Sequence, residues 1–494
     1  MRTINTIILI SIIISTLLYA QNSNQTPGLE TITLTDLMEK VQYLSSKDLE
    51  GRLAGSDGYN KAAGWASDKF KELGLKPANG DEYFQKLMVE YNEITGPCKL
   101  NLISNNEIVN QYKLGNDFVC RGFTGSDHIT APVVFCGYGI SRPDIRYDDY
   151  ENIDVKGKIV MVFKYNPRWN IDDKNWGTNY PREKSFTAAQ HGAIGILFMS
   201  TPNDAPLQKT IGSILAGPGE QNESFPQLHV DLPAAEDFFV NSGYNLKELQ
   251  SAIDSNKKPL SVNLNISAEL EVHAKYFKQR ETENVAALLE GSDPQLKNEY
   301  IVIGAHLDHV GSQADEIYFP GANDNASGSA GVLEIAEALS QADIKPKRSI
   351  IFVLFASEEL GLNGARYFVN NSPVPIQNIT AMMNMDCIAS GDSIMIGGGG
   401  KAKNLWNLVK ELDAENSNLM VANTWTGGGA DASPFFERGI PTAYFVTTNG
   451  YEHLHYMTDT PKTLNQPLFE NIVKLAYSTA YKLAMGEYQR ENVE

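Results

Sequence analysis

Acidic and histidine side chains recur in the C-terminal half of this sequence, each shortly after an apolar segment. Imidazole and carboxylate groups together suit zinc best, although cobalt or manganese can occupy the same kind of shell. Two ions held side by side can activate a water molecule for hydrolysis, and the additional carboxylate of Glu358 is available to move its proton. The five candidate ligands are His306, Asp324, Glu359, Asp386 and His455.

These side chains are expected at one edge of a buried sheet. Apolar segments at 300–305, 349–356 and 381–385 each lead into one of the candidates, and His455 follows a fourth such segment. Asp324 lies in a Gly-bounded turn just before an expected helix. In open α/β sheets, ligands bind at the edge where the parallel strands end. The sequence therefore predicts that the candidates share one site.

Each candidate alone has an ordinary structural explanation. A histidine at a strand end is usually hydrogen-bonded, the adjacent Glu358 and Glu359 would usually form a solvated turn, and an aspartate such as Asp324 before a helix is usually an N-cap. The occurrence of all five at successive strand ends favours a metal site instead. His306 and Asp308 project to the same side of their strand, which predicts that Asp308 orients His306.

The pattern of apolar segments predicts an α/β fold. After residue 283, buried strands alternate with helices, as in a mixed, mostly parallel, doubly wound sheet with helices on both faces. Residues 33–76 are expected to form two helices around a Gly-rich turn. Between 101 and 267, short β-type runs alternate with polar loops that carry no tight cluster of potential ligands. This stretch is predicted to be a separate, β-rich α/β domain without a chemical role.

The net charge of the chain and its first twenty residues indicate the class of partner and the cellular location. The 41 Lys and Arg against 60 Asp and Glu give a formal charge of −19, which argues against nucleic acid as a partner. Residues 1–20 contain one charge, Arg2, an apolar stretch at 7–18, and the small residue Ala20, which together predict a signal peptide. We expect export to the periplasm or the medium, without membrane attachment after cleavage. An uncleaved anchor is the alternative, because Leu18 stands where a smaller residue is usual.

The four cysteines leave the disulfide pattern open. Export permits disulfides without requiring them. One bridge is possible among Cys98, Cys120 and Cys136, but its pairing cannot be read from sequence. Cys387 is expected to be a small buried hydrophobic residue.

Several motifs resemble peptidase family M28, a family of zinc aminopeptidases and carboxypeptidases. GAHLDHVG, GANDNASGSAG, FASEELGLNGARYF, MNMD and HYMTDTP carry the resemblance over residues 283–485, and LEGRLAGSDGYNKAAG resembles the opening helices of that family. GYGI and DVKGKIVMVF resemble an inserted protease-associated (PA) domain. The resemblance implies a zinc exopeptidase fold. The expected segments are a signal peptide at 1–20, peptidase parts at 21–100 and 268–494, and a PA domain at 101–267.

The resemblance also implies how the ligands divide between two zinc ions. His306 and Asp386 would hold one ion, Glu359 and His455 would hold the other, and Asp324 would bridge both. It further implies a cis peptide bond after Asp324.

Catalytic roles are carried over in the same way, with one departure. Glu358 would be the general base, and Asp308 would stand behind His306. Relatives often have a tyrosine just before the final histidine, where it can hydrogen-bond the oxyanion, but this chain has Leu454. Tyr451 or Tyr456 could replace it, so the oxyanion donor stays open.

The expected activity is that of a secreted, two-zinc aminopeptidase acting on peptides with a free N-terminus. A glutaminyl cyclase-like enzyme with one zinc, a carboxypeptidase, and an inactive receptor with the same fold are the alternatives. The inserted domain could restrict the site to short peptides, contact larger proteins, or form a homodimer. Three further side chains have no assigned metal: His309 and His453 are expected to be structural or rim residues, and Asp431 to support the site or contact the substrate amine.

Overall fold

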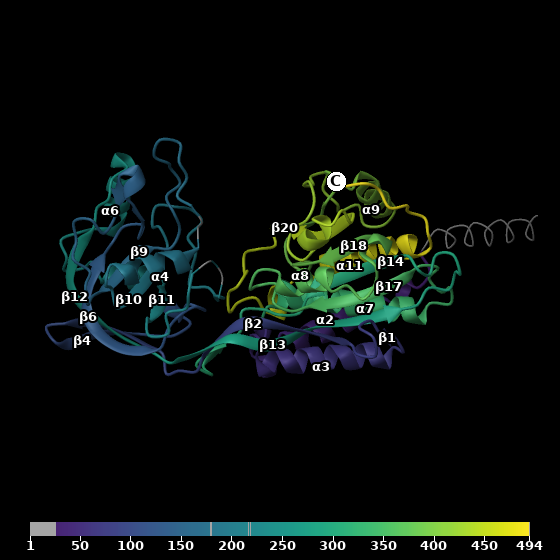
Figure 1. Cartoon of the computed structure of the whole chain (residues 1–494), viewed down its shortest axis with the longest axis horizontal. Coiled ribbons are helices and arrows are strands. Elements are labelled where there is room, and N and C mark those ends of the chain that lie inside the picture. Colours follow the sequence, from purple (N-terminus) through teal and green to yellow (C-terminus); the bar gives the residue numbers. More distant parts are fainter. Residues whose placement is uncertain (1–25, 178–179, 216, 218, 494) are drawn as a thin grey trace, which may run out of the picture.

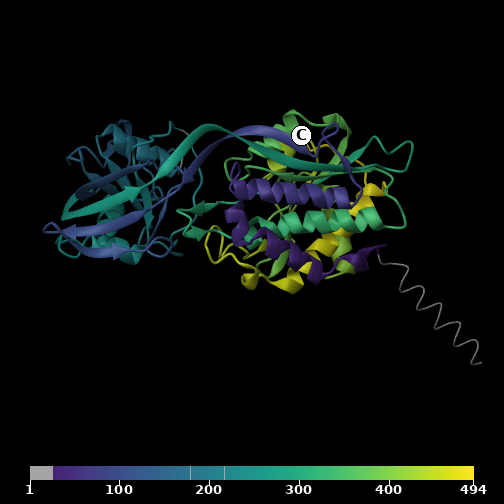
Figure 2. The ribbon, with the colours of Figure 1, turned by 90° about the horizontal axis from the view of Figure 1, so that it is seen from below.

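The chain folds into two lobes joined by a pair of long strands. The computed structural model describes residues 26–177, 180–215, 217 and 219–493, so the expected signal peptide lies outside the described residues. The strands β2 (Phe84–Ile94) and β13 (Ala274–Leu289) pair antiparallel and run from one lobe toward the other (Figures 1 and 2). Among the described residues, no helix has the length and apolar character needed to span a bilayer.

The larger lobe is built on a mixed eight-stranded sheet. The four central strands β17, β14, β18 and β20 are parallel, and the outer pairings are antiparallel. The nearly continuous apolar sequences of the four central strands are buried along almost their whole length, as expected for a sheet covered on both faces. The strand order is β1 (Lys76–Pro77), β13, β17 (Ser349–Phe355), β14 (Tyr300–His306), β18 (Ile379–Met385), β20 (Thr442–Thr448) and β19 (Ser393–Gly397), with β2 paired to β13.

Helices cover both faces of this sheet, which confirms the predicted fold class. The core on one face includes α2 (Leu34–Leu44), α3 (Asp57–Glu72), α7 (Gly328–Gln341), α9 (Lys403–Glu415) and α11 (Gln466–Ala484). The other face packs against α8 (Asn363–Asn370) and α10 (Ala432–Phe436). The two helices predicted within 33–76 are α2 and α3. Both begin at a hydroxyl N-cap, since Thr33 and Ser56 accept hydrogen bonds from first-turn backbone N–H groups.

The smaller lobe contains a second eight-stranded sheet. Helix α4 (Pro181–Gln190) packs on one face, and α5 (Leu232–Asp237) and α6 (Leu246–Asn256) pack on the other. The strand order is β4 (Glu107–Tyr112), β3 (Lys99–Ser104), β12 (Val262–Val272), β6 (Asp127–Phe135), β9 (Ile159–Phe163), β10 (Gly195–Met199), β11 (Gln227–Val230) and β5 (Phe118–Cys120). According to the sheet to which each strand belongs, the chain passes from one lobe to the other at 95–98 and at 273.

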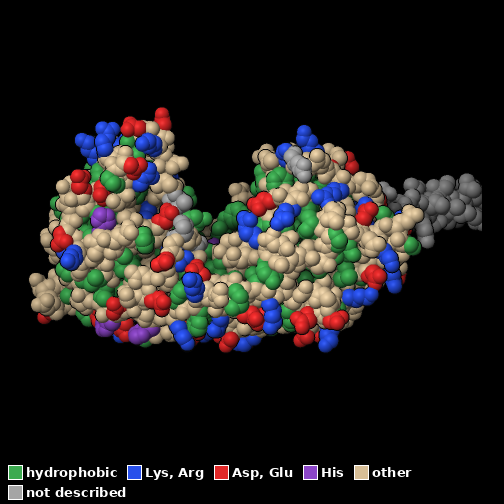
Figure 3. Space-filling model, in the orientation of Figure 1, with side chains coloured by type: hydrophobic (Ala, Val, Ile, Leu, Met, Phe, Trp, Pro, Cys, Tyr) green, Lys and Arg blue, Asp and Glu red, His purple; other side chains and the backbone are tan. Residues whose placement is uncertain are grey.

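The lobes contact each other beside the ends of the central parallel strands. Gln313, in the segment after β14, donates to the carbonyl of Cys120 and accepts from its N–H, at 2.8 and 2.9 Å. Val119 of the smaller lobe packs in one apolar cluster with Val310 and Phe319 of the larger lobe. The surface is hollowed between the lobes above this contact (Figure 3). The smaller lobe therefore borders the sheet edge where the ligands were predicted.

All four cysteines are buried and free, so the disulfide considered possible among the first three is not formed. Cys387 is 3% exposed, which confirms the expectation of a small buried residue.

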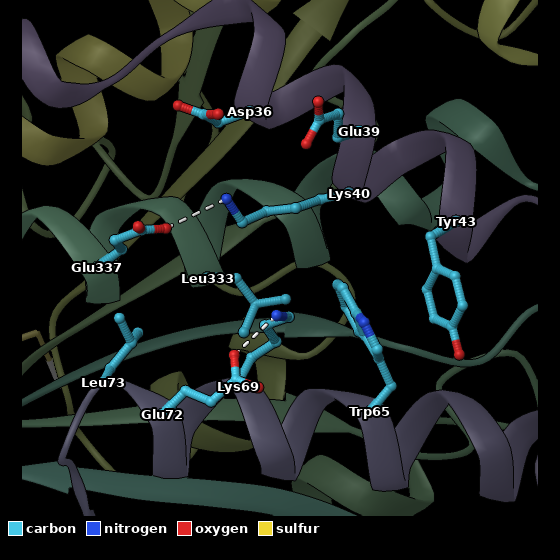
Figure 4. Close-up of a pocket in the computed structure, with 10 residues that line it drawn as sticks. All are labelled: Asp36, Glu39, Lys40, Tyr43, Trp65, Lys69, Glu72, Leu73, Leu333 and Glu337. Carbon is cyan, nitrogen blue, oxygen red and sulfur yellow. Dashed lines mark hydrogen bonds and ion pairs between the residues drawn. The ribbon is translucent and has the colours of Figure 1, made fainter.

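A separate surface pocket of about 350 Å³ lies between α2, α3 and α7 (Figure 4). Tyr43 and Trp65 form its aromatic side, with ring centroids 4.6 Å apart. Its lining contains none of the candidate metal ligands. The pocket therefore lies among the helices of one face of the lobe and is distinct from the site at the ends of the central strands.

Candidate metal centre

The predicted ligands converge into two adjacent clusters that share one aspartate. His306 ends β14, and Asp386 directly follows β18. Glu359 lies in the turn after β17, and His455 lies in the loop after β20. Asp324 joins both clusters from the turn before α7, and every ligand atom within a cluster lies within 4.8 Å of the others.

The two oxygens of Asp324 face different clusters. Oδ1 lies 3.3 Å from His306 Nε2, which is also 3.3 Å from Asp386 Oδ1. Oδ2 lies 3.2 Å from His455 Nε2, which is 3.0 Å from Glu359 Oε2. A carboxylate in this position is placed to bridge two ions.

His309 completes the second cluster, although sequence reasoning had assigned it no metal. Its Nδ1 lies 3.0 Å from Glu359 Oε1 and 3.6 Å from Asp324 Oδ2. The side chain is fully buried, so it is not a rim residue. Gly321 makes room for the imidazole, since a Cβ at that position would lie 2.5 Å from His309 Cδ2.

The donor set and its spacing fit zinc. Ligands about 2.0–2.1 Å from a tetrahedral ion lie about 3.3 Å from one another. The separations between ligand atoms in the two clusters, 3.0–3.6 Å, match this value. The first cluster offers three protein ligands and the second offers four. Only the first therefore has the number of protein ligands that is typical of an open, catalytic zinc site.

Charge also favours cations at this position. Burial opposes ionisation of Glu359, but His455 and His309 lower its pKa to about 2. Burial would lower the pKa of His306, yet Asp386 and Asp324 raise it well above 6.5. The acids thus outnumber the histidines that can balance them, and divalent cations would supply the missing positive charge.

Asp308 holds the turn that contains the two glutamates. Its Oδ1 accepts from the N–H of Glu358 at 3.1 Å, and its Oδ2 accepts from the N–H of Glu359 at 3.4 Å. The carboxylate is 3.8 Å from His306 Nδ1, beyond hydrogen-bonding distance, whereas the backbone carbonyl of Asp308 lies 3.2 Å from that nitrogen. Asp308 thus lies next to His306, but its carboxylate accepts hydrogen bonds from the turn with the two glutamates, and only its backbone carbonyl is within hydrogen-bonding distance of the imidazole.

Glu358 is the uncommitted carboxylate of the site. In the part of the chain that the structure describes, its side chain makes no hydrogen bond and no ion pair. Burial raises its pKa well above the usual value, and the neighbouring Glu359 and Asp431 raise it further, although His306 acts in the opposite direction. A carboxyl group without a hydrogen-bond or ion-pair partner is free to accept and return a proton.

Asp459 and Tyr444 support the shared ligands and were not singled out for these roles by sequence reasoning. Asp459 Oδ2 accepts from the N–H of Asp324 at 3.1 Å, and Oδ1 accepts from the N–H of Asn323 at 2.9 Å. The Tyr444 hydroxyl donates to Asp386 Oδ2 at 2.7 Å. The expected cis peptide bond after Asp324 is present.

Arg52 ties the loops under the centre together. The fully buried guanidinium donates from Nε to the carbonyl of Leu307 at 2.9 Å and from Nη2 to that of Gly321 at 3.0 Å. It also donates to the carbonyls of Pro320 and Leu44. One side chain therefore joins α2, the segment after β14 and the turn that precedes Asp324.

The other residues considered in the sequence analysis differ in how deeply they are buried. Leu454 packs with the apolar cluster beside α10, and His453 bonds Thr458 on the surface loop. Asp431 is fully buried, and both of its side-chain oxygens lack a partner. Its role in supporting the site or contacting the substrate amine stays a prediction. Tyr451 is half exposed, beside the loop that carries His455.

Comparisons with known proteins agree with the motifs. The model of peptidase family M28 matches residues 284–480, and the PA domain model matches residues 129–237. Leucine aminopeptidase 2 of Arthroderma otae is 25% identical over 435 residues, which cover 84% of this chain and 73% of that protein. Leupeptin-inactivating enzyme 1 of Streptomyces exfoliatus is 43% identical over 108 residues, 22% of this chain but only 23% of that protein. A zinc aminopeptidase from Bacillus subtilis shares the fold, with a TM-score of 0.61 at 19% identity over 93% of this chain and 98% of its own.

Replacing Arg52 tests the support beneath the centre. Arg52→Met should lower the free energy of unfolding by about 3 kcal/mol, because it leaves several buried carbonyls without donors. Urea unfolding of the metal-loaded protein measures the change. Arg146→Met is the control, since the Arg146 side chain is 84% exposed. Equal stability of the two variants would contradict the role given to Arg52.

Proposed function

We propose that this chain, which belongs to peptidase family M28 and carries an inserted PA domain, is an exported two-zinc aminopeptidase that acts on peptides with a free N-terminus. The observation that carries the proposal is the position of Asp324, whose two oxygens face two separate ligand clusters. The second complete cluster favours two ions over the single zinc of a glutaminyl cyclase-like enzyme. The retention of every ligand type disfavours an inactive receptor.

Different residues of the chain would hold the metal ions and transfer the proton at the scissile peptide bond. His306, Asp324 and Asp386 would hold one zinc ion, and Asp324, Glu359 and His455 the other, with His309 as a fourth side chain beside that second ion. When bound, such ions acidify a water molecule and polarise the carbonyl group. Glu358 would take a proton from the water molecule as the water oxygen bonds to the carbonyl carbon. It would then pass that proton to the departing amine.

Tyr451 is our candidate for the oxyanion donor in place of the tyrosine missing at Leu454. Burial raises the pKa of its hydroxyl, and Cys387, Asp386 and Asp324 contribute to the shift, so the hydroxyl stays protonated at neutral pH. Half of the side chain is exposed, which leaves it accessible to a substrate. Tyr456 lies instead toward Lys209 of the inserted lobe.

Zinc content tests the shared position of Asp324. The native protein should bind two zinc ions, Asp386→Ala should retain the ion held by the other cluster, and Asp324→Ala should weaken binding of both. Zinc measured by mass spectrometry after dialysis at graded chelator concentrations gives the stoichiometry. Asp68→Ala, on the exposed surface of α3, is the control. Equal zinc loss in the two ligand variants would argue against a bridging aspartate.

Glu358→Gln separates proton transfer from metal binding. The amide cannot accept the proton, so kcat should fall by about 10²–10⁴-fold while the zinc content stays native. Glu452→Gln, an exposed position in the loop before His455, should keep full activity. Near-native turnover by Glu358→Gln would remove the general-base assignment.

A substrate panel tests the reaction class. Leucyl peptides with a free amino group should be hydrolysed from the N-terminus, and their N-acetylated forms should not, with loss of activity on chelation. Mass spectrometry of the products distinguishes this outcome from C-terminal trimming and from cyclisation of N-terminal glutamine. Either of those products, in the absence of N-terminal release, would overturn the aminopeptidase proposal.

A further inference from the structure

Three buried basic side chains lie on one face of the sheet in the inserted lobe. His229 of β11 is paired with Val119 of β5, and Arg121 lies two residues beyond Val119, on the same face. Lys164 comes directly after β9, where its N–H donates to the carbonyl of Met199. Arg121, Lys164 and His229 are 6%, 3% and 0% exposed. The alternation of side chains along strands places all three on the face that carries Val119, which packs against the larger lobe.

These three side chains influence one another without an acid to balance them. Burial lowers the pKa of His229 well below 6.5, and the charges of Lys164 and Arg121 lower it further. Burial and Arg121 likewise lower the pKa of Lys164. Burial lowers the pKa of Arg121 to about 10, so the guanidinium remains charged at neutral pH. Within the described residues, no carboxylate forms an ion pair with any of the three.

Several of their nitrogen atoms have no hydrogen-bond partner. Nε and Nη1 of Arg121 and both ring nitrogens of His229 are buried and unpartnered. Lys164 Nζ donates to Gln208 Oε1 at 2.5 Å, and the Arg121 guanidinium stacks 5.3 Å from the Phe123 ring centroid. A ring contact does not neutralise a buried guanidinium, and an uncompensated buried charge is strongly destabilising. The cluster therefore lacks an acceptor that carries negative charge.

A loop that covers this cluster also contacts the metal centre. The loop of residues 207–214 contains Gln208, the partner of Lys164, and Ser213, whose Oγ accepts from the N–H next to Arg121 at 3.0 Å. In the same loop, the N–H of Gly212 donates to the carbonyl of His455 at 2.7 Å. Gly212 also packs closely on Val310, since a Cβ there would lie 2.3 Å from Val310 Cγ2. The basic cluster and a proposed zinc ligand thus share one covering segment.

We propose that Arg121, Lys164 and His229 bind a small monovalent anion beneath the loop 207–214. The guanidinium supplies the positive charge, and the amine of Lys164 and the neutral imidazole of His229 each donate an N–H. Burial of all three excludes large polyanions. The anion is either a halide from solvent or the terminal carboxylate of a short peptide whose amino end lies at the metal centre. The second source rests on the proposed function, and the first does not.

Thermal unfolding of the zinc-loaded protein tests the halide. Sodium chloride or bromide should raise Tm saturably by about 2 °C or more over sodium gluconate at equal ionic strength, because an ion that binds only the folded state stabilises it. Arg121→Met and Lys164→Met should each remove the difference, and Arg146→Met should retain it. The second variant keeps the test decisive if the first does not fold.

Peptide kinetics distinguish the second source. If the anion is a substrate carboxylate, leucyl dipeptides should be cleaved with at least a tenfold higher kcat/KM than their C-terminal amides, chloride should compete with them, and Lys164→Met should erase the preference. A halide effect on Tm without a preference for the free acid identifies the solvent ion, even if the chain proves not to be an aminopeptidase. No halide effect on Tm together with equal cleavage of acids and amides would overturn the anion site.

Discussion

The concentration of buried carboxylates at one sheet edge is the constraint on which the rest of the larger lobe depends. Asp308, Asp324, Glu358, Glu359 and Asp386 lie together where four parallel strands end, and two or three histidines cannot balance them. Hydrogen bonds from neighbouring groups hold two of these carboxylates in position. Backbone N–H groups donate to Asp308, and the Tyr444 hydroxyl donates to Asp386. A rigid acidic pocket of this kind favours divalent cations, because they supply the positive charge that the histidines do not.

Much of this arrangement could be predicted from sequence, because strand ends are local features. Apolar segments that stop at His306 or Asp386 mark both the sheet and its edge, and the structure brings the five predicted ligands together. The roles of Arg52, Asp459 and His309 could not be found in this way. Arg52 acts on carbonyls more than 250 residues away, and His309 reaches the second cluster only because the turn after β14 reverses its direction. Such roles depend on tertiary contacts that leave no periodic trace.

The inserted lobe shows the same division between local pattern and assembly. The short β-type segments between 101 and 267 predict its strands and its separate core. Its contact with the larger lobe could not be predicted from them. Contact depends on single groups such as the Gln313 amide and the Gly212 backbone, which meet their partners across the junction. Through them the smaller lobe forms part of the surroundings of His455, so a domain whose described residues contribute no metal ligand still borders the centre.

The paired strands that join the lobes also explain how such a domain can enter a pre-existing fold. Ala274 and Ile94 are register partners, so the chain leaves the larger lobe and returns to it at adjacent points. Partners in an antiparallel ladder have Cα atoms only about 4.5–5.5 Å apart, a gap that a short hairpin turn can close. The whole insertion is therefore an elaborated hairpin tip, a position where evolution can lengthen or shorten a protein without disturbing the register of the sheet beneath.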